Sequence, residues 1–244
     1  MRLIQVTDCH LHADPRARSR AGFPLRQLER ALEAVVDERP DLVLITGDIS
    51  QDETAASYQL AERALARLGC PWFWLAGNHD DPAQMAAVRE LQTEVELDGW
   101  RLLLLDTRVS GHPHGELGEA QLAALAERLE ADDRPTLITM HHPPLAVGSE
   151  WLDAIGLADR EALWQTLAAY PQVRLILCGH IHQAFASRQR HAEGEVAVYG
   201  CPSTTDQFLA GSAAFAIDEA SRPGYRVVEL RGDDWDTWVE RVEL

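Results

Sequence analysis

The sequence predicts an α/β fold, a sandwich in which part of the sheet is parallel and the C-terminal part is antiparallel. Three observations predict it. Short apolar runs alternate with amphipathic helical patterns, the runs are apolar throughout, and after Gly179 the pattern changes to short strands and turns. Continuous apolar runs are typical of strands that are covered on both faces. Because no linker or internal repeat interrupts the pattern, we expect one domain over residues 1–244.

Six apolar runs are expected to form the buried strands of this sandwich. They lie at residues 3–6, 42–46, 72–75, 102–105, 137–140 and 173–178. The change of pattern after Gly179 predicts four more short strands, which belong to the antiparallel part of the fold. These lie at residues 195–199, 213–217, 226–230 and 235–242.

Apolar residues recur at helical spacing in three segments between the strands, so that each segment would bury one face. The residues are Leu25, Leu28, Leu32 and Val35, then Tyr58, Ala61, Leu65 and Leu68, and then Leu122, Leu125 and Leu129. Gly69 follows the second segment at a position where glycine commonly ends a helix.

The chain is strongly acidic, with a formal charge of −17 over 244 residues and a pI near 4.9. Nucleic-acid polymers and anionic membranes bind cationic patches, so neither is expected as a partner. A small anion in a locally positive pocket remains compatible with this charge. No segment has the apolar length of a membrane span, and the first residues resemble a buried strand rather than a secretory signal. The four cysteines form no C-x-x-C pair, which favours reduced thiols and a cytoplasmic location.

Polar residues with the chemistry of metal ligands follow five of the predicted strands. In chain order these segments are Asp8-Cys9-His10, Gly47-Asp48, Gly77-Asn78-His79-Asp80, His141-His142 and Gly179-His180-Ile181-His182. Sites of open α/β sheets lie at the carboxyl ends of the strands, so we expect these segments to meet. The glycines permit sharp turns and a close approach of the backbone to a ligand.

Seven oxygen or nitrogen donors stand in these segments, more than the four that one tetrahedral zinc ion takes. They are Asp8, His10, Asp48, Asn78, His141, His180 and His182. The number fits two metal ions that share one carboxylate. A D-x-H or H-x-H pair on an extended turn would direct both side chains to one side. One such pair alone is usually a surface turn, but five segments in order after strands favour a metal site.

The order of these motifs resembles the calcineurin-like metallophosphoesterase superfamily, over residues 3 to about 182. Its pattern is D-x-H, G-D, G-N-H-D or G-N-H-E, a later His, and G-H-x-H. Residues 149–153, 156–157 and 202–208 are similar to bacterial class III cyclic nucleotide phosphodiesterases. The resemblance implies a sandwich of two mixed β-sheets flanked by helices, with the active site at the carboxyl ends of the strands.

The same resemblance implies a role for each ligand residue. One metal ion would be bound by Asp8, His10, Asp48 and His182, and the second by Asp48, Asn78, His141 and His180, with Asp48 bridging. Asn78, His79 and His182 would contact the substrate, and His79 and Asp48 would be catalytic. Adjacent histidines usually point apart, so we expect His142 to support the site rather than bind metal. The family favours iron and manganese, and zinc also suits these donors.

The function implied is hydrolysis of 3′,5′-cyclic AMP to 5′-AMP by in-line attack of a metal-bridging hydroxide, with His79 protonating the leaving alkoxide. Two alternatives are open. One is a broad phosphodiesterase acting on 2′,3′-cyclic nucleotides or glycerophosphodiesters. The other is a cyclic-nucleotide-binding regulator with a degenerate site, against which the intact ligand set counts. Both a monomer and a homodimer are compatible with the sequence.

The substrate pocket is expected to be walled by three segments outside the metal motifs. They are residues 16–23, 111–115 and 202–207. His12 follows the first motif and is expected at the surface.

Overall fold

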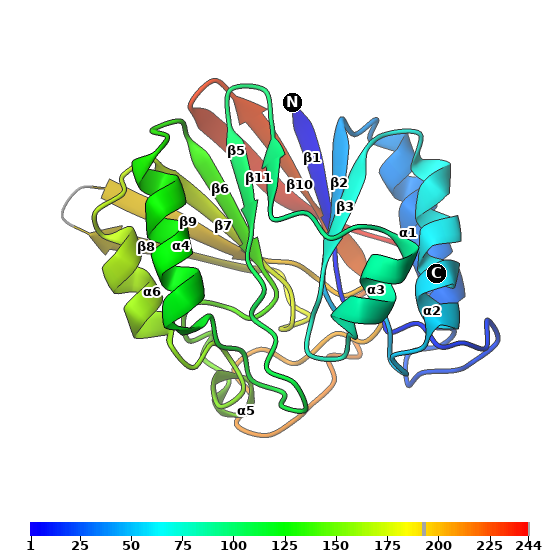
Figure 1. Cartoon of the computed structure of the whole chain (residues 1–244). Coiled ribbons are helices and arrows are strands. Elements are labelled where there is room, and N and C mark those ends of the chain that lie inside the picture. The colour runs from blue at the N-terminus through cyan, green and yellow to red at the C-terminus, as the bar shows by residue number, and fades with distance from the viewer. Residues whose placement is uncertain (192–193, 244) are drawn as a thin grey trace.

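The computed structural model describes residues 1–191 and 194–243 and arranges them as two mixed β-sheets packed face to face, with helices on both outer faces (Figure 1). This confirms the predicted fold class. The strands are β1 (Arg2–Val6), β2 (Leu42–Thr46), β3 (Trp72–Leu75), β4 (Glu94–Glu96), β5 (Arg101–Leu104), β6 (Thr136–Met140), β7 (Val173–Cys178), β8 (Phe185–His191), β9 (Gly194–Gly200), β10 (Gly224–Arg231) and β11 (Asp234–Arg241). The helices are α1 (Pro24–Asp37), α2 (Ala55–Leu65), the 3₁₀ turn η1 (Ala66–Leu68), α3 (Pro82–Val88), α4 (Gly118–Glu130), α5 (Glu150–Asp153) and α6 (Arg160–Leu167).

Each sheet combines a block of parallel strands with antiparallel strands on one or both sides. The first runs in the order β11-β10-β1-β2-β3, in which β1, β2 and β3 are parallel. The second runs β4-β5-β6-β7-β9-β8, in which β5, β6, β7 and β9 are parallel. The carboxyl ends of the parallel strands in each sheet therefore reach a common edge, where the segments that follow them can meet.

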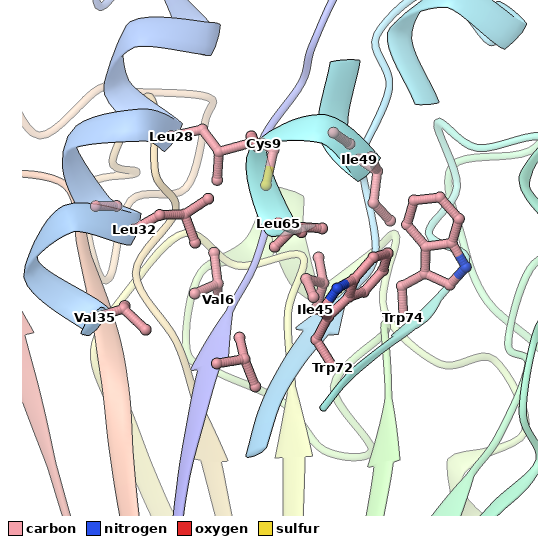
Figure 2. Close-up of a cluster of buried hydrophobic side chains, with 14 of the residues drawn as sticks. Val6, Cys9, Leu28, Leu32, Val35, Ile45, Ile49, Leu65, Trp72 and Trp74 are labelled. Atoms are coloured by element: carbon pink, nitrogen blue, oxygen red, sulfur yellow. The ribbon is translucent and has the colours of Figure 1, made fainter. Parts of the chain in front are cut away.

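Successive side chains of each strand point to opposite faces of its sheet, and the core is therefore divided into three layers. Leu3, Leu44 and Leu177 belong to the layer between the sheets. Their neighbours face outward, and Figure 2 shows Val6 and Ile45 directed toward the apolar faces of α1 and α2. A third layer lies between the second sheet and α4 and α6. Burial on both faces explains why the parallel strands are mostly apolar.

The helices follow the predicted spacing. α1 begins with Pro24 in its first turn, where the missing N–H costs nothing. The Thr54 hydroxyl caps α2 by accepting from the Ser57 N–H at 3.3 Å. Gly69 has φ 71°, the left-handed conformation expected at the end of that segment. In the part of the chain that the structure describes, no helix has the length and apolar character to cross a bilayer.

Buried polar side chains join the two sheets. The Gln5 amide on β1 donates to Thr46 Oγ1 and to the Cys178 carbonyl oxygen, each at 2.9 Å. The Arg226 guanidinium on β10 donates to the Gly200 carbonyl oxygen of β9 at 2.9 Å and to the Phe185 carbonyl oxygen at 3.2 Å. A shift of one sheet against the other would leave these groups unpaired, so the contacts fix the relative position of the strand ends.

The prediction of a strand at residues 213–217 is wrong. This segment is a loop that makes a single bridge, between Phe208 and Ile217. Ala213, Ala214 and Phe215 are exposed, so the apolar composition of this segment does not reflect burial in a sheet. Two strands were not predicted, β4 and β8. Both are edge strands in which polar and charged residues interrupt the apolar pattern.

Candidate metal centre and substrate cleft

The structure brings all seven predicted ligand residues together at the carboxyl ends of five parallel strands. Asp8 and His10 follow β1, Asp48 follows β2, Asn78 follows β3, His141 follows β6, and His180 and His182 follow β7. Both sheets therefore contribute. In Figure 1 this is the lower edge, where α5 and the orange segment after β9 also lie.

The backbone at the site differs from the extended turn expected for D-x-H and H-x-H. Asp8, His10, His180 and His182 have φ of 55°, 47°, 68° and 49°. These are left-handed conformations, and Asp48 adopts one as well, with φ 51°. The Asp8 and His10 N–H groups donate to the Gly47 and Asp48 carbonyl oxygens at 3.0 Å, which ties the two turns together. Strained backbone conformations of this kind concentrate at functional sites.

Two glycines leave room for the ligand side chains. A Cβ at Gly77 would overlap Asp48 Oδ1, and a Cβ at Gly47 would overlap His141 Nδ1. Gly47 also has φ 94°, which other residues rarely adopt. The glycine of each motif is therefore required by the close packing of the motifs against each other.

Four donors converge in the first half of the site. His182 Nε2 lies 3.3 Å from Asp8 Oδ1 and 3.3 Å from His10 Nε2. His10 Nε2 lies 3.8 Å from Asp48 Oδ2. Ligands bonded at about 2.1 Å to one ion lie roughly 3.0–3.4 Å apart at tetrahedral or octahedral angles. The two 3.3 Å spacings fit one shared divalent ion, and the 3.8 Å spacing to Asp48 is slightly longer.

The second half is built around Asn78. Its Oδ1 lies 3.1 Å from His141 Nε2 and 3.0 Å from His180 Nδ1. Asp48 Oδ1 lies 3.4 Å from His141 Nε2. Asp48 therefore directs one oxygen to each half of the site, as a bridging carboxylate would.

Hydrogen bonds behind the site orient two of the imidazoles. His141 Nδ1 lies 2.8 Å from the Thr46 carbonyl oxygen, and His182 Nδ1 lies 2.7 Å from the Asp206 carbonyl oxygen. A carbonyl only accepts, so each Nδ1 carries a proton, and in the neutral ring each Nε2 has a lone pair directed to the site.

Burial and charge fit a cation at this position. Burial alone would raise the pKa of Asp48, but His141 and His10 beside it hold that pKa well below its usual range. Burial lowers the pKa of His10 to about 4, so its ring is neutral near pH 7. Asp8 Oδ1 is buried and accepts no hydrogen bond from the described residues. A buried anionic oxygen in this state needs a positive partner, which a metal ion supplies.

His142 lies beside His141 and His180, with ring centroids 4.9 Å and 4.7 Å apart, but both of its ring nitrogens have other partners. Its Nδ1 lies 2.8 Å from Thr107 Oγ1 and its Nε2 lies 3.1 Å from the Pro113 carbonyl oxygen. Burial and the neighbouring His141 lower the pKa of His142 to about 3, so the ring is neutral. These contacts give it a structural role beside the site.

Asp80 is the last residue of the third motif, and the sequence does not predict a role for it. Its carboxylate accepts from the N–H groups of Gly77 and Ser50 at 2.9 Å and of Ile49 at 3.1 Å. It therefore joins the turn after β3 to the turn after β2. Burial, together with the charge of Asp48, raises the pKa of Asp80 to about 7.

His79 stands at the open side of the metal donors. Its backbone N–H donates to Asp48 Oδ1 at 2.9 Å, which sets the position of the residue. Its ring Nδ1 lies 3.3 Å from Gln51 Nε2, and its ring centroid lies 5.2 Å from that of His10. The side chain is half-buried and lines the cleft.

A cleft of about 560 Å³ opens above the donors, a size suited to a small organic ligand. All three expected wall segments reach it, through Arg18, Ser19 and Arg20, through Pro113, and through Thr205 and Asp206. His12 lines the cleft as well, and its side chain is 30% exposed, so it is both a surface residue and a neighbour of the site.

Three aromatic rings in the cleft wall were not predicted as site residues. We call Trp151, Phe208 and Phe215 the aromatic cluster. Their ring centroids lie 5.0–5.5 Å apart in edge-to-face contacts. Phe208 also stacks on His182, with centroids 3.9 Å apart and planes 8° from parallel. Trp151 and Phe208 stand in segments that carried the narrower resemblance, whereas Phe215 was hidden in the strand wrongly expected at 213–217.

The family model described as calcineurin-like phosphoesterase matches residues 1–184. The chain therefore belongs to the calcineurin-like phosphoesterase family, which is a family of hydrolases. It is 40% identical over 249 aligned positions to the 3′,5′-cyclic adenosine monophosphate phosphodiesterase CpdA of Pseudomonas aeruginosa, covering 99% of this chain and 90% of the relative. The protein of the same name from Escherichia coli K12 is 36% identical over 242 positions, with 96% and 86% covered.

Solved structures support the fold. The crystal structure of a dimetal phosphatase from Danio rerio superposes with a TM-score of 0.69 at 17% identity, covering 100% of this chain and 99% of that one. A likeness at this identity concerns the arrangement of the two sheets and their helices.

Proposed function

We propose that this protein is a dinuclear-metal phosphodiesterase that hydrolyses 3′,5′-cyclic AMP to 5′-AMP. The observation that carries the proposal is the placement of Asp48, whose two carboxylate oxygens face two separate groups of donors at the floor of the cleft. Relatives named as 3′,5′-cyclic AMP phosphodiesterases, identical at 36–40% over nearly the whole chain, support the substrate.

Two groups of residues would hold the metal ions. Asp8, His10, Asp48 and His182 form one group, and Asp48, Asn78, His141 and His180 form the other. Mixed imidazole, carboxylate and amide donors suit iron and manganese, with zinc also compatible. When bound, two divalent ions acidify a water molecule and neutralise phosphate charge for in-line attack.

The ligand set favours an anionic substrate in spite of the overall charge of −17. Asp8 and Asp48 are its only anionic members, so two divalent ions leave the site net positive. A phosphodiester carries one negative charge and would be attracted to this local field. Most of the other carboxylates lie on the surface, where solvent and salt screen them. Asp80, which is buried beside the site, and Asp206, which lines the cleft, are exceptions.

His79 would supply the proton that the leaving ribose oxygen needs. The hydrogen bond from its backbone to Asp48 holds it beside the donors, and its ring lines the cleft. Asn78 and His182 would contact the phosphate together with His79. An alkoxide is a poor leaving group, so protonation by a positioned imidazole contributes to the rate.

We also propose that this activity is cytoplasmic. Cys9, Cys70, Cys178 and Cys201 are unbridged, and disulfides are rare in reducing compartments.

The test is to measure kcat/KM for 3′,5′-cyclic AMP, 2′,3′-cyclic AMP and bis-p-nitrophenyl phosphate, with Mn²⁺-loaded and metal-free protein. Strong metal-dependent preference for the 3′,5′ ring supports the proposal. Much faster cleavage of the other two diesters would replace it with a broad phosphodiesterase. If 3′,5′-cyclic AMP binds and stays intact for hours in the presence of metal, the protein is a regulator and the proposal fails.

A further inference from the structure

The cleft has two chemically different sides. Metal donors form its floor, while the aromatic cluster and the loop that carries Arg18 and Arg20 contribute to its walls. The loop follows β1, and Phe208 and Phe215 belong to the segment after β9, so these wall residues come from distant parts of the chain. The phosphate chemistry described above uses the floor and leaves the walls without a role.

Phe215 is the unusual member of the aromatic cluster. It is 47% exposed, and only two other large hydrophobic side chains among the described residues are exposed, Val36 and Leu209. Phe208, by contrast, is occupied by its stack on His182. An exposed aromatic ring at a cleft is a ready surface for a flat apolar ligand.

Arg20 reaches Phe215 from the opposite loop. Its guanidinium carbon lies 4.8 Å from the centroid of the Phe215 ring. Within residues 1–191 and 194–243, no carboxylate lies within ion-pair distance of Arg20 or Arg18. Guanidinium planes and aromatic rings are both surfaces on which nucleobases stack.

We propose that Arg20 and Phe215 form the subsite that stacks against the planar base of a nucleotide whose phosphate lies at the metal donors. The nature of this ligand rests on the proposed function. Phe208 contacts both His182, by stacking, and Phe215, edge to face with centroids 5.5 Å apart. A single ring thus separates the subsite from a metal ligand, a span that a ribose can bridge.

The experiment compares two ligands that differ only in the base. Mn²⁺-loaded protein is titrated by calorimetry with 5′-AMP and with ribose 5-phosphate, so that no turnover is needed. The wild type is expected to bind 5′-AMP at least tenfold more tightly. Phe215→Ala should lower the affinity for 5′-AMP by about tenfold, in the range of one lost stacking contact. The affinity for ribose 5-phosphate should not change.

Three further variants make the test specific. Leu209→Ala removes a similarly exposed side chain of the same loop that does not line the cleft, and it should change neither affinity. Phe215→Trp should retain the preference for 5′-AMP because it retains a ring. Arg20→Lys should weaken the binding of 5′-AMP, because an ammonium group keeps the charge but cannot stack on a base.

The result separates this proposal from the reaction itself. Equal binding of 5′-AMP and ribose 5-phosphate by the wild type would overturn the subsite, even in an enzyme that hydrolyses 3′,5′-cyclic AMP. An equal decrease in the affinities for both ligands in Phe215→Ala would also overturn the proposed subsite. A preference for 5′-AMP that depends on Phe215, in a protein without cyclic-AMP hydrolysis, would retain the subsite and reject the proposed function.

Discussion

The ring of Phe208 lies flat on the ring of His182, with centroids 3.9 Å apart and an angle of 8° between the planes. At its edge, His182 is held by the hydrogen bond from Nδ1 to the Asp206 carbonyl oxygen. Phe208 and Asp206 belong to one segment, so this segment fixes both the plane and the tautomer of a proposed metal ligand. Residues that orient a ligand in this way contribute to metal affinity.

Phe208→Ala is therefore expected to lower metal affinity by about tenfold, the lower end of the effect of such supporting residues. The measurement is a competition between the protein and a chelator for Mn²⁺. Leu209→Ala is the matched control and should leave the affinity unchanged. Unaltered Mn²⁺ affinity in Phe208→Ala would show that His182 is oriented without the stack.

His79→Ala should lower kcat on 3′,5′-cyclic AMP by about 10²–10⁴-fold, the usual contribution of a general acid. Metal content, measured by elemental analysis, should not change, because no ring atom of His79 is assigned to a metal. The loss on bis-p-nitrophenyl phosphate should be much smaller, since nitrophenolate leaves without protonation. Equal losses on the two substrates would contradict the role of proton donor.

Asp80→Ala should lower the free energy of unfolding by about 3 kcal/mol, because three buried N–H groups lose their acceptor. Urea denaturation of the metal-free protein measures this loss. Asp81→Ala is the adjacent control. Asp81 caps α3 through the Ala83 and Gln84 N–H groups, so its loss should be only about 1 kcal/mol. Similar losses for the two variants would mean that Asp80 is no more important than a helix cap.

Removal of metal should destabilise the protein. Ligand at a hundredfold excess over Kd stabilises by about 2.7 kcal/mol per site, which for a chain of this size corresponds to a change in Tm of about 5–10 °C. Thermal denaturation with and without Mn²⁺ after treatment with a chelator measures the change. Asp48→Asn should lose most of it, because Asp48 faces both halves of the site. A Tm that does not respond to Mn²⁺ would argue against metal binding at these donors.

Burial explains which strands could be predicted. β2, β3 and β7 have the predicted bounds because they are covered on both faces and end at glycine-containing motifs. β4 and β8 are edge strands with polar residues, and their pairing depends on neighbours that are distant in sequence. Apolar composition alone could not show that residues 213–217 face a cleft rather than a sheet.

The candidate site could be predicted in residue identity but not in conformation. The positions of Asp8 and His10 after an apolar run indicated that they meet the other motifs. Their left-handed backbone depends on hydrogen bonds to Gly47 and Asp48, which a local pattern does not contain. The role of Arg20 could not be predicted for a similar reason. Its contact with Phe215 joins loops that are nearly 200 residues apart in the sequence.

The small number of carboxylates among the proposed ligands has a consequence for turnover. Cyclic AMP carries one negative charge, but its hydrolysis creates a phosphomonoester with a charge of about −1.5 to −2 at pH 7. A net positive site therefore attracts the product more strongly than the substrate. The same field that attracts the diester would retain 5′-AMP after the ring has opened. Release of the product, rather than bond cleavage, would then limit the rate of turnover. The enzyme would therefore be inhibited by accumulated 5′-AMP.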